Sequence, residues 1–219
     1  MHHRTAIFIF TNMATKKQVE NFNGIDEATD LIELGQPYTV SFTVQGTGKM
    51  LMHCWNISSI AEKAAAKKNS ATKKTDDLES YVLRDDQKKI VMPALNFCAA
   101  IREAGKSFSD PTSPRKSMKD RLKAIIIPNE EYGYINGGVT TWDFVDSRRV
   151  VIQRAGITRQ RPGFYEGWEI EFSIIVLEPE FLPLAKLVEI VDNAGKFQGL
   201  GDFRPTFGRF RIKEVHLVE

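Results

Sequence analysis

Alternating apolar and polar residues predict β-strands near the start of the chain. In residues 38–55, Val40, Phe42 and Val44 fall on one face of an extended segment, and hydroxyl and amide side chains fall on the other. Gly46 indicates a bulge or turn after this run, before a second β-like run begins. Two strands are therefore expected within this segment.

Helical periodicity is present in two later segments. A short strand is expected to end at Pro93, and a helix follows it with apolar residues at positions 94, 97, 98, 101 and 104. Gly105 ends this helix. A second helix is expected to begin at Pro179 and to end at residues 193–195.

The remaining elements complete an alternating layout. Residues 122–127 read as a buried strand stopped by a proline, and residues 211–217 alternate as a last strand. Between them, residues 148–154 and 168–176 read as the arms of a hairpin with its tip at 155–167. The order is a decorated β-α-β-β-α-β pattern. The sequence therefore predicts an α+β fold class with a ferredoxin-like or RNA-recognition-type core.

Polar segments divide the chain. Residues 56–89 begin as helix-prone and turn polar, which predicts a large mobile insertion, and residues 105–120 form a second, basic insertion. Residues 1–35 read as an N-terminal arm, so residues 36–219 are expected to form a single domain. Met13 resembles a natural start, which would make the first twelve residues an upstream read-in; an arm used in packing is the alternative.

Composition narrows the class of protein. The 219 residues suit one decorated domain, and a net charge of +2 excludes a basic field over the whole molecule. No stretch approaches the roughly 18 apolar residues of a membrane span, so no membrane partner is expected. Cys54 and Cys98 lack the spacing of metal ligands and suit a reduced, intracellular compartment.

Basic residues are nevertheless clustered, and one cluster is mixed with aromatic residues. Single strands need positive charge for their phosphates and flat side chains for their unstacked bases. We therefore expect single-stranded nucleic acid to bind at Lys63, Lys67, Lys68, Lys73, Lys74, Arg115, Lys116, Arg148, Arg154, Arg159, Arg161, Phe164, Tyr165, Arg204 and Arg209. The alternative is that the cations are only solvated and the aromatic residues fill the core.

Two motifs carry a resemblance to a known family. The run Ile90-Val91-Met92-Pro93-Ala94-Leu95-Asn96-Phe97-Cys98-Ala99-Ala100-Ile101-Arg102 resembles the first-helix signature of the repeat-associated mysterious protein (RAMP) superfamily. Gly199-Leu200-Gly201 with Gly208-Arg209-Phe210 resembles its C-terminal glycine-rich loop. That superfamily includes backbone subunits of CRISPR surveillance complexes and CRISPR-RNA processing endonucleases, and uncharacterised bacteriophage proteins share the outline. The chain departs from the pattern at Asn96, where the family often has serine, and at Asp202 and Pro205 inside the loop.

The resemblance implies a function and an assembly. A nucleic-acid-binding sheet would carry the 56–89 insertion as a thumb, and residues 105–120 and 155–167 would flank the channel. A protein of the backbone-subunit type would self-associate along RNA or single-stranded DNA into a filament or multisubunit complex, with other subunits as partners, in the cytoplasm of a bacterial host cell. The alternatives are a RAMP-type endoribonuclease and a phage-encoded mimic that interferes with CRISPR complex assembly.

Catalysis has weaker support than binding in the residues themselves. His53 lies in an apolar run and reads as a core histidine. Four aspartates accompany the lysines of the long insertion: Asp76, Asp77, Asp85 and Asp86. Acidic pairs in such a segment usually serve charge balance; the alternative, which the RAMP resemblance implies, is that a thumb aspartate cleaves target RNA with a divalent ion. We therefore assign no catalytic residue, metal ligand or cofactor, and expect a binding protein more than an enzyme.

Overall fold

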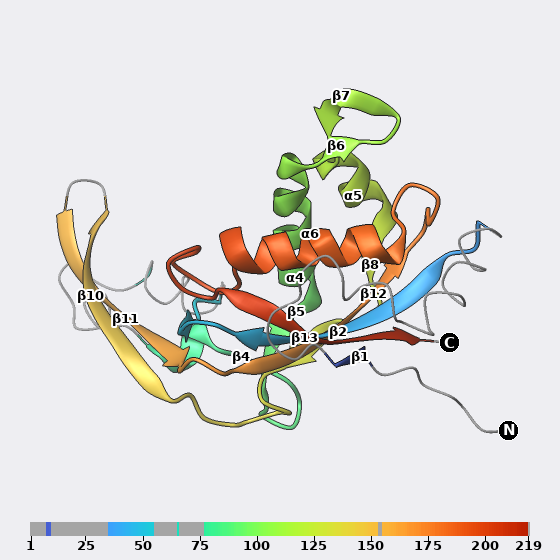
Figure 1. Ribbon diagram of the computed structural model, residues 1–219. Coiled ribbons are helices and arrows are strands. Elements are labelled where there is room, and N and C mark those ends of the chain that lie inside the picture. The colour runs from blue at the N-terminus through green and yellow to red at the C-terminus, as the bar shows by residue number, and fades with distance from the viewer. Residues whose placement is uncertain (1–7, 10–34, 55–64, 66–76, 153–154, 219) are drawn as a thin grey trace, which may run out of the picture.

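The computed structural model describes residues 8–9, 35–54, 65, 77–152 and 155–218 (Figure 1). The helices in this part of the chain are α4 (Ala94–Ala104), α5 (Lys119–Ile125) and α6 (Leu184–Phe197), with short 3₁₀ turns η2 (Glu79–Tyr81) and η3 (Gly105–Ser107). The strands are β1 (Phe8–Ile9), β2 (Tyr38–Gly46), β3 (Met50–Leu51), β4 (Leu83–Arg84), β5 (Ile90–Pro93), β6 (Ser109–Asp110), β7 (Ser113–Ser117), β8 (Ile126–Pro128), β9 (Tyr132–Tyr134), β10 (Phe144–Ile152), β11 (Ala155–Phe164), β12 (Glu169–Val176) and β13 (Phe210–Val218). The predicted α+β fold class is confirmed.

The main sheet has the strand order β1-β13-β2-β12-β8, and its neighbours are all antiparallel. Without β1, this order is fourth, first, third and second along the chain, with α4 and α6 in the two crossovers. That arrangement is a ferredoxin-like βαββαβ sheet. β1 pairs with the outer edge of β13, which agrees with the alternative that the N-terminal residues form an arm used in packing. The start of the native chain at Met13 stays a prediction.

The core lies between this sheet and the helices, which cover one face of it (Figure 1). Phe97 of α4 is fully buried and stacks on Phe172 of β12, with ring centroids 4.6 Å apart. The Phe97 ring also contacts Phe42 of β2 and Phe210 of β13. The predicted helix 94–104 is confirmed by α4. Through the Phe97 ring, its apolar face contacts three strands of the main sheet.

Residues 122–127 do not form the predicted strand. Instead, α5 ends at Ile125, and the short strand β8 follows it. Met118, Leu122 and Ile125 are all buried, at spacings of four and three residues that place them on one helical face. A short apolar run does not distinguish a buried strand from a buried helix, so the sequence pattern of residues 122–127 was compatible with both.

The second helix begins and ends later than predicted. It starts at Leu184, after Pro183, because a proline disfavours helical geometry at the preceding residue. The helix continues through Gly195 to Phe197. A Cβ atom at Gly195 would lie 2.2 Å from the carbonyl oxygen of Phe210, so this glycine serves close packing against β13 rather than helix termination.

The predicted hairpin pairs differently from the expected one. β10 pairs with β11 over their whole length, from Phe144↔Gly163 to Ile152↔Ala155, whereas β12 joins the main sheet. Residues 155–164 are therefore a strand and not a hairpin tip. The ribbon of β10 and β11 is roughly 30 Å long at 3.4 Å per residue and projects from the body of the molecule (Figure 1).

The two predicted insertions have different outcomes. Most of the 56–89 insertion falls outside the described residues, so its thumb-like role stays a prediction. The 105–120 segment contains the small antiparallel ribbon of β6 and β7, which lies beyond α5 (Figure 1). Among the described residues, no helix is long and apolar enough to cross a membrane.

Candidate nucleic-acid interface

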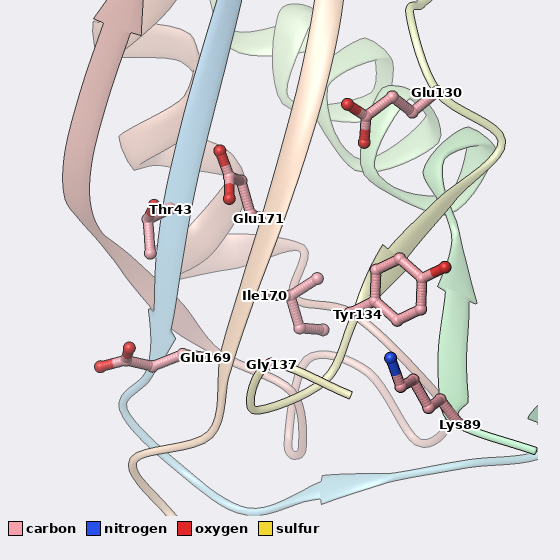
Figure 2. A pocket seen from close by; sticks show the side chains of 8 residues that line it. All are labelled: Thr43, Lys89, Glu130, Tyr134, Gly137, Glu169, Ile170 and Glu171. Carbon is pink, nitrogen blue, oxygen red and sulfur yellow. The ribbon is translucent and has the colours of Figure 1, made fainter. Parts of the chain in front are cut away.

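The face of the main sheet opposite the helices is acidic. Glu169 and Glu171 project from β12 beside Thr43 of β2, and Glu130 and Lys89 lie nearby (Figure 2). Together they line part of a cavity of about 350 Å³. RNA-recognition-type sheets bind bases on aromatic side chains of their central strands. The central strands β2 and β12 place no aromatic side chain on this face, and the exposed ring that lines the cavity, Tyr134, comes from β9 outside the main sheet. The pattern of aromatic residues on central strands is therefore absent from the described residues of this sheet face.

Hydrogen bonds hold the side chains of this open face together. Ser41 donates to Glu171 at 2.7 Å, and Gln45 donates to Glu169 at 2.8 Å. Lys213 of β13 forms an ion pair with Glu169 at 2.8 Å, and this bond raises the pKa of Lys213. One cation of the open face, Lys213, is thus used to neutralise a carboxylate of the same face, whereas Arg211 donates to the side-chain oxygen of Gln45.

The ribbon of β10 and β11 has a different pattern. Its register places Arg148 opposite Arg159 and Asp146 opposite Arg161. Alternate residues of a strand share a face, so all four side chains lie on the same face of the ribbon. Arg148 is paired with Asp146 at 2.5 Å, which raises the pKa of the arginine. Two arginines directly opposite each other are unfavourable unless an anion lies near them.

The glycine-rich loop (residues 199–209) packs along β3, which is the neighbour of β11. Asp202 donates its backbone N–H to the Leu51 carbonyl at 2.8 Å, and Gly208 donates to the Lys49 carbonyl at 2.8 Å. A Cβ atom at Gly201 would lie 2.4 Å from the Leu51 carbonyl oxygen, so only glycine allows this approach. The loop is thereby fixed beside the arginine face of the ribbon.

Asp202 links the loop to the ribbon. Its carboxylate forms an ion pair with Arg161 and lies 3.4 Å from Nδ1 of His53. Burial raises the pKa of Asp202, but hydrogen bonds from His53, the Phe203 backbone N–H and Arg161 outweigh burial and hold that pKa well below its usual range. Arg161 is only 7% exposed, and its Nη1 atom is buried without a hydrogen-bond partner.

Aromatic rings alternate with these cations. The Arg148 guanidinium lies 4.6 Å from the ring centre of Phe207, and that of Arg161 lies 4.5 Å from the ring centre of Phe203. Next to them, Lys49 lies 5.2 Å from the ring centre of Phe144. We call this region the arginine–aromatic surface and define it by Lys49, Phe144, Arg148, Arg159, Tyr165, Phe203, Arg204, Phe207 and Arg209.

The structure brings some predicted contact residues together on this surface and corrects others. Tyr165 is 52% exposed and stacks on Phe144, and Arg204 and Arg209 are exposed on the loop. Phe164 is fully buried in the core, and Arg161 is buried against Asp202, so neither is accessible to a ligand in this conformation. Both predictions are wrong as surface contacts: Phe164 faces the core, whereas Arg161 lies on the other face of the strand and is covered by Asp202 and Phe203 of the glycine-rich loop.

The other predicted contacts divide into two groups. Arg115 and Lys116 are exposed on β7, which lies beyond the helices and well away from the ribbon (Figure 1). They cannot belong to one channel with Arg159. The remaining predicted contacts lie outside the described residues: Lys63, Lys67, Lys68, Lys73, Lys74 and Arg154.

Sequence reasoning missed several members of the site. Phe203 and Phe207 lie on either side of Arg204 within the glycine-rich loop. This pattern of an arginine between two aromatic residues could have identified them as members of the site. His53 read as a core residue, yet its side chain is 40% exposed and its ring meets Tyr81 edge-on at 4.4 Å. The placement of Lys49 beside Phe144 had no signal in the sequence, because 95 positions separate the two residues.

Comparisons with known proteins give a remote structural likeness. No protein-family model and no curated protein matches the chain. Among solved structures, a chain in the cryo-EM structure of the Type III-B Cmr-beta bound to cognate target RNA matches with a TM-score of 0.47 and 11% identity, over 94% of this chain and 68% of that chain. A likeness this remote carries no assignment of residues. Within the described part of the chain, no group of three or more metal-ligating side chains is suitably placed to hold a metal ion.

Proposed function

We propose that the protein binds single-stranded nucleic acid, RNA or DNA, on the arginine–aromatic surface. The observation that carries the proposal is the exposure of Arg204 and Arg209 beside aromatic rings that lie outside the hydrophobic core. Cations serve the phosphates and flat rings serve the unstacked bases. Every base has a stacking face, so this combination binds with little sequence preference.

The carboxylates of this surface support the proposal as well. Asp146 and Asp202 face Arg148 and Arg161, and they orient guanidinium groups over Phe207 and Phe203. The acids therefore hold these guanidinium groups against the rings. Arg204 and Arg209 of the loop are exposed, and Nε of Arg209 donates to the Pro205 carbonyl at 3.0 Å. A surface of this kind is prepared for stacking before any ligand arrives, which lowers the entropy cost of binding.

Salt-dependent titration tests the proposal. Labelled single-stranded RNA and DNA of equal length should both bind at low salt, and the affinity should fall linearly on a logarithmic scale as salt rises. Duplexes of the same sequence serve as the control and should bind more weakly, because their bases are already stacked. The proposal fails if single strands do not bind at low salt, or if the affinity is independent of salt.

Self-association along the strand is the second part of the proposal, and the RAMP resemblance motivates it. One arginine–aromatic surface spans a limited length of strand, so a longer strand offers sites for further copies. Sedimentation with oligonucleotides of increasing length should give one, two and then more copies per strand. A constant single copy on every length would contradict this part while leaving binding intact.

Metal-free cleavage of bound RNA is a second candidate function, favoured by the surroundings of His53. A half-exposed imidazole whose Nδ1 faces a carboxylate resembles an oriented general base. Tyr81 lies between His53, whose ring it meets, and Arg159, whose Nη1 atom donates to the Tyr81 hydroxyl at 3.5 Å, so this side of the site also holds a cation of the kind that stabilises developing negative charge. Incubation of RNA with the wild-type protein in the presence of a chelator should then give cleavage products, and the His53→Ala variant should not form them. Equal products from both proteins would exclude His53 as the base.

A further inference from the structure

Two aromatic residues of the glycine-rich loop are held outside the core. Phe203 and Phe207 meet each other edge-on, with ring centres 6.5 Å apart, and both are partly exposed. Neither belongs to the hydrophobic core or packs against it as a partly buried apolar residue. Their rings instead lie against the guanidinium groups of Arg148 and Arg161. Hydrophobic burial therefore does not explain why large aromatic residues stand here.

Phe203 also has an unfavourable backbone conformation. Its φ angle is +56°, in the left-handed region that glycine adopts freely and bulky residues avoid. Glycines occupy this region elsewhere in the same loop, at Gly199, Gly201 and Gly208. Phe203 therefore adopts a backbone conformation that phenylalanine disfavours, and residues in such conformations are concentrated at functional sites.

We propose that Phe203 is a base-stacking residue: it forms a platform, with the flanking guanidinium groups, for one unstacked nucleobase of the bound strand. The guanidinium groups and aromatic rings already alternate as flat π surfaces, and a nucleobase continues such a series. This inference rests on the proposed function and deepens it. It assigns the glycine-rich loop to the bases, whereas its exposed arginines serve the phosphates.

The probe is a single-stranded oligonucleotide that carries one 2-aminopurine, whose fluorescence falls when it stacks on an aromatic ring. With the wild-type protein, at least one probe position should be quenched on binding. In Phe203→Leu that additional quenching should disappear, and the affinity should fall at least about fivefold. The dependence on salt should stay unchanged, since no charge is removed. An abasic nucleotide at the quenched position should weaken binding to the wild type and leave Phe203→Leu unaffected.

A matched control lies elsewhere in the molecule. Phe181 is also a partly buried ring with a guanidinium above it, that of Arg121 at 4.3 Å, but it lies outside the arginine–aromatic surface. Phe181→Leu should bind and quench as the wild type does. Equal losses in both variants would overturn the proposal.

Phe203→Gly separates a binding role from a structural one. Glycine relieves the left-handed strain and loses only ring contacts, so the melting temperature should stay within about 3 °C of the wild type while the quenching disappears. Parallel loss of stability and affinity would show that Phe203 only holds the loop. If the wild type binds but Phe203→Leu keeps both its affinity and its quenching, this inference fails and the proposed function stands. If the wild type binds no single strand, both fail.

Discussion

The open face of the main sheet and the arginine–aromatic surface contain similar groups arranged in opposite ways. On the open face, Glu169 and Glu171 point to solvent, and Lys213 is used to neutralise one of them. On the arginine–aromatic surface, Asp202 is tucked against the buried Arg161, and Arg204 and Arg209 point to solvent. If the protein binds an anionic strand as we propose, the position of the carboxylates, and not the number of cations, decides which of the two surfaces attracts it.

The net charge of +2 does not report this difference between the two surfaces. Acids and bases are nearly balanced over the whole chain, but the fold sorts them onto different faces. Local potential governs association with a polyanion, because screening limits each charge to about 10 Å at ordinary salt.

The largest effect should come from the exposed arginines of the loop. Replacing both Arg204 and Arg209 by Ala should reduce the slope of log affinity against log salt by about 1.4, since two phosphate contacts are lost at about 0.7 each. The double variant Arg115→Ala and Lys116→Ala removes the same charge from β7 and should bind as the wild type does. If the β7 variant loses more affinity, the interface lies at β7 and not on the arginine–aromatic surface.

Loss of the Asp202 carboxylate should destabilise the loop. Asp202→Asn leaves the buried Arg161 guanidinium without its counter-ion, which should cost about 2 kcal/mol in the free energy of unfolding. Denaturant titration measures this cost. Adding Arg161→Met should recover part of the loss, because no unpaired charge then remains buried. Additive destabilisation in the double variant would show that the two side chains are not coupled.

The same carboxylate should titrate unusually late in acid. The folded pKa of Asp202 lies below the unfolded value of about 3.9, so its contribution to stability is present above pH 4 and is lost as the pH falls through the folded pKa. Carboxyl chemical shifts followed by NMR should place the midpoint for Asp202 below that of the unfolded chain. A midpoint at or above 3.9 would mean that the ion pair with Arg161 does not form in solution.

The smallest effect should come from the open face. Replacing Glu169 and Glu171 by Gln removes two outward carboxylates, and affinity for a single strand should rise by no more than about threefold, because their repulsion at a distance is screened by salt. A filter-binding titration at two salt concentrations measures this. A rise above tenfold would identify the open face as the place where the strand lies.

Parts of the fold were predictable because their signals are local. The alternation of Val40, Phe42 and Val44 predicted β2, and the apolar spacing from Ala94 to Ala104 predicted α4. The errors arose where two structures share one local pattern. Residues 122–127 read as a strand although Leu122 and Ile125 belong to a helix, and residues 155–164 read as a turn although they pair with β10.

The site was predictable only in part. Arg204, Arg209 and Tyr165 were assigned from composition and proved to be exposed. Phe164 carried the same signal and is fully buried, because residues 164 and 165 point to opposite faces of the chain. A one-residue difference in register thus separates a core aromatic from a surface one, and composition does not report register.

By itself, the sequence determined the elements whose apolar periodicity needs no distant partner, and with them the α+β class and the order of the crossovers. It also determined that cations and aromatic residues are plentiful near the C-terminal glycines. Only the tertiary structure decided that β3 joins the glycine-rich loop to β11, and so placed Asp202 on Arg161 and Phe207 beside Arg148. Those contacts join residues far apart along the chain, and their geometry follows from strand register and close backbone packing, which no local pattern encodes.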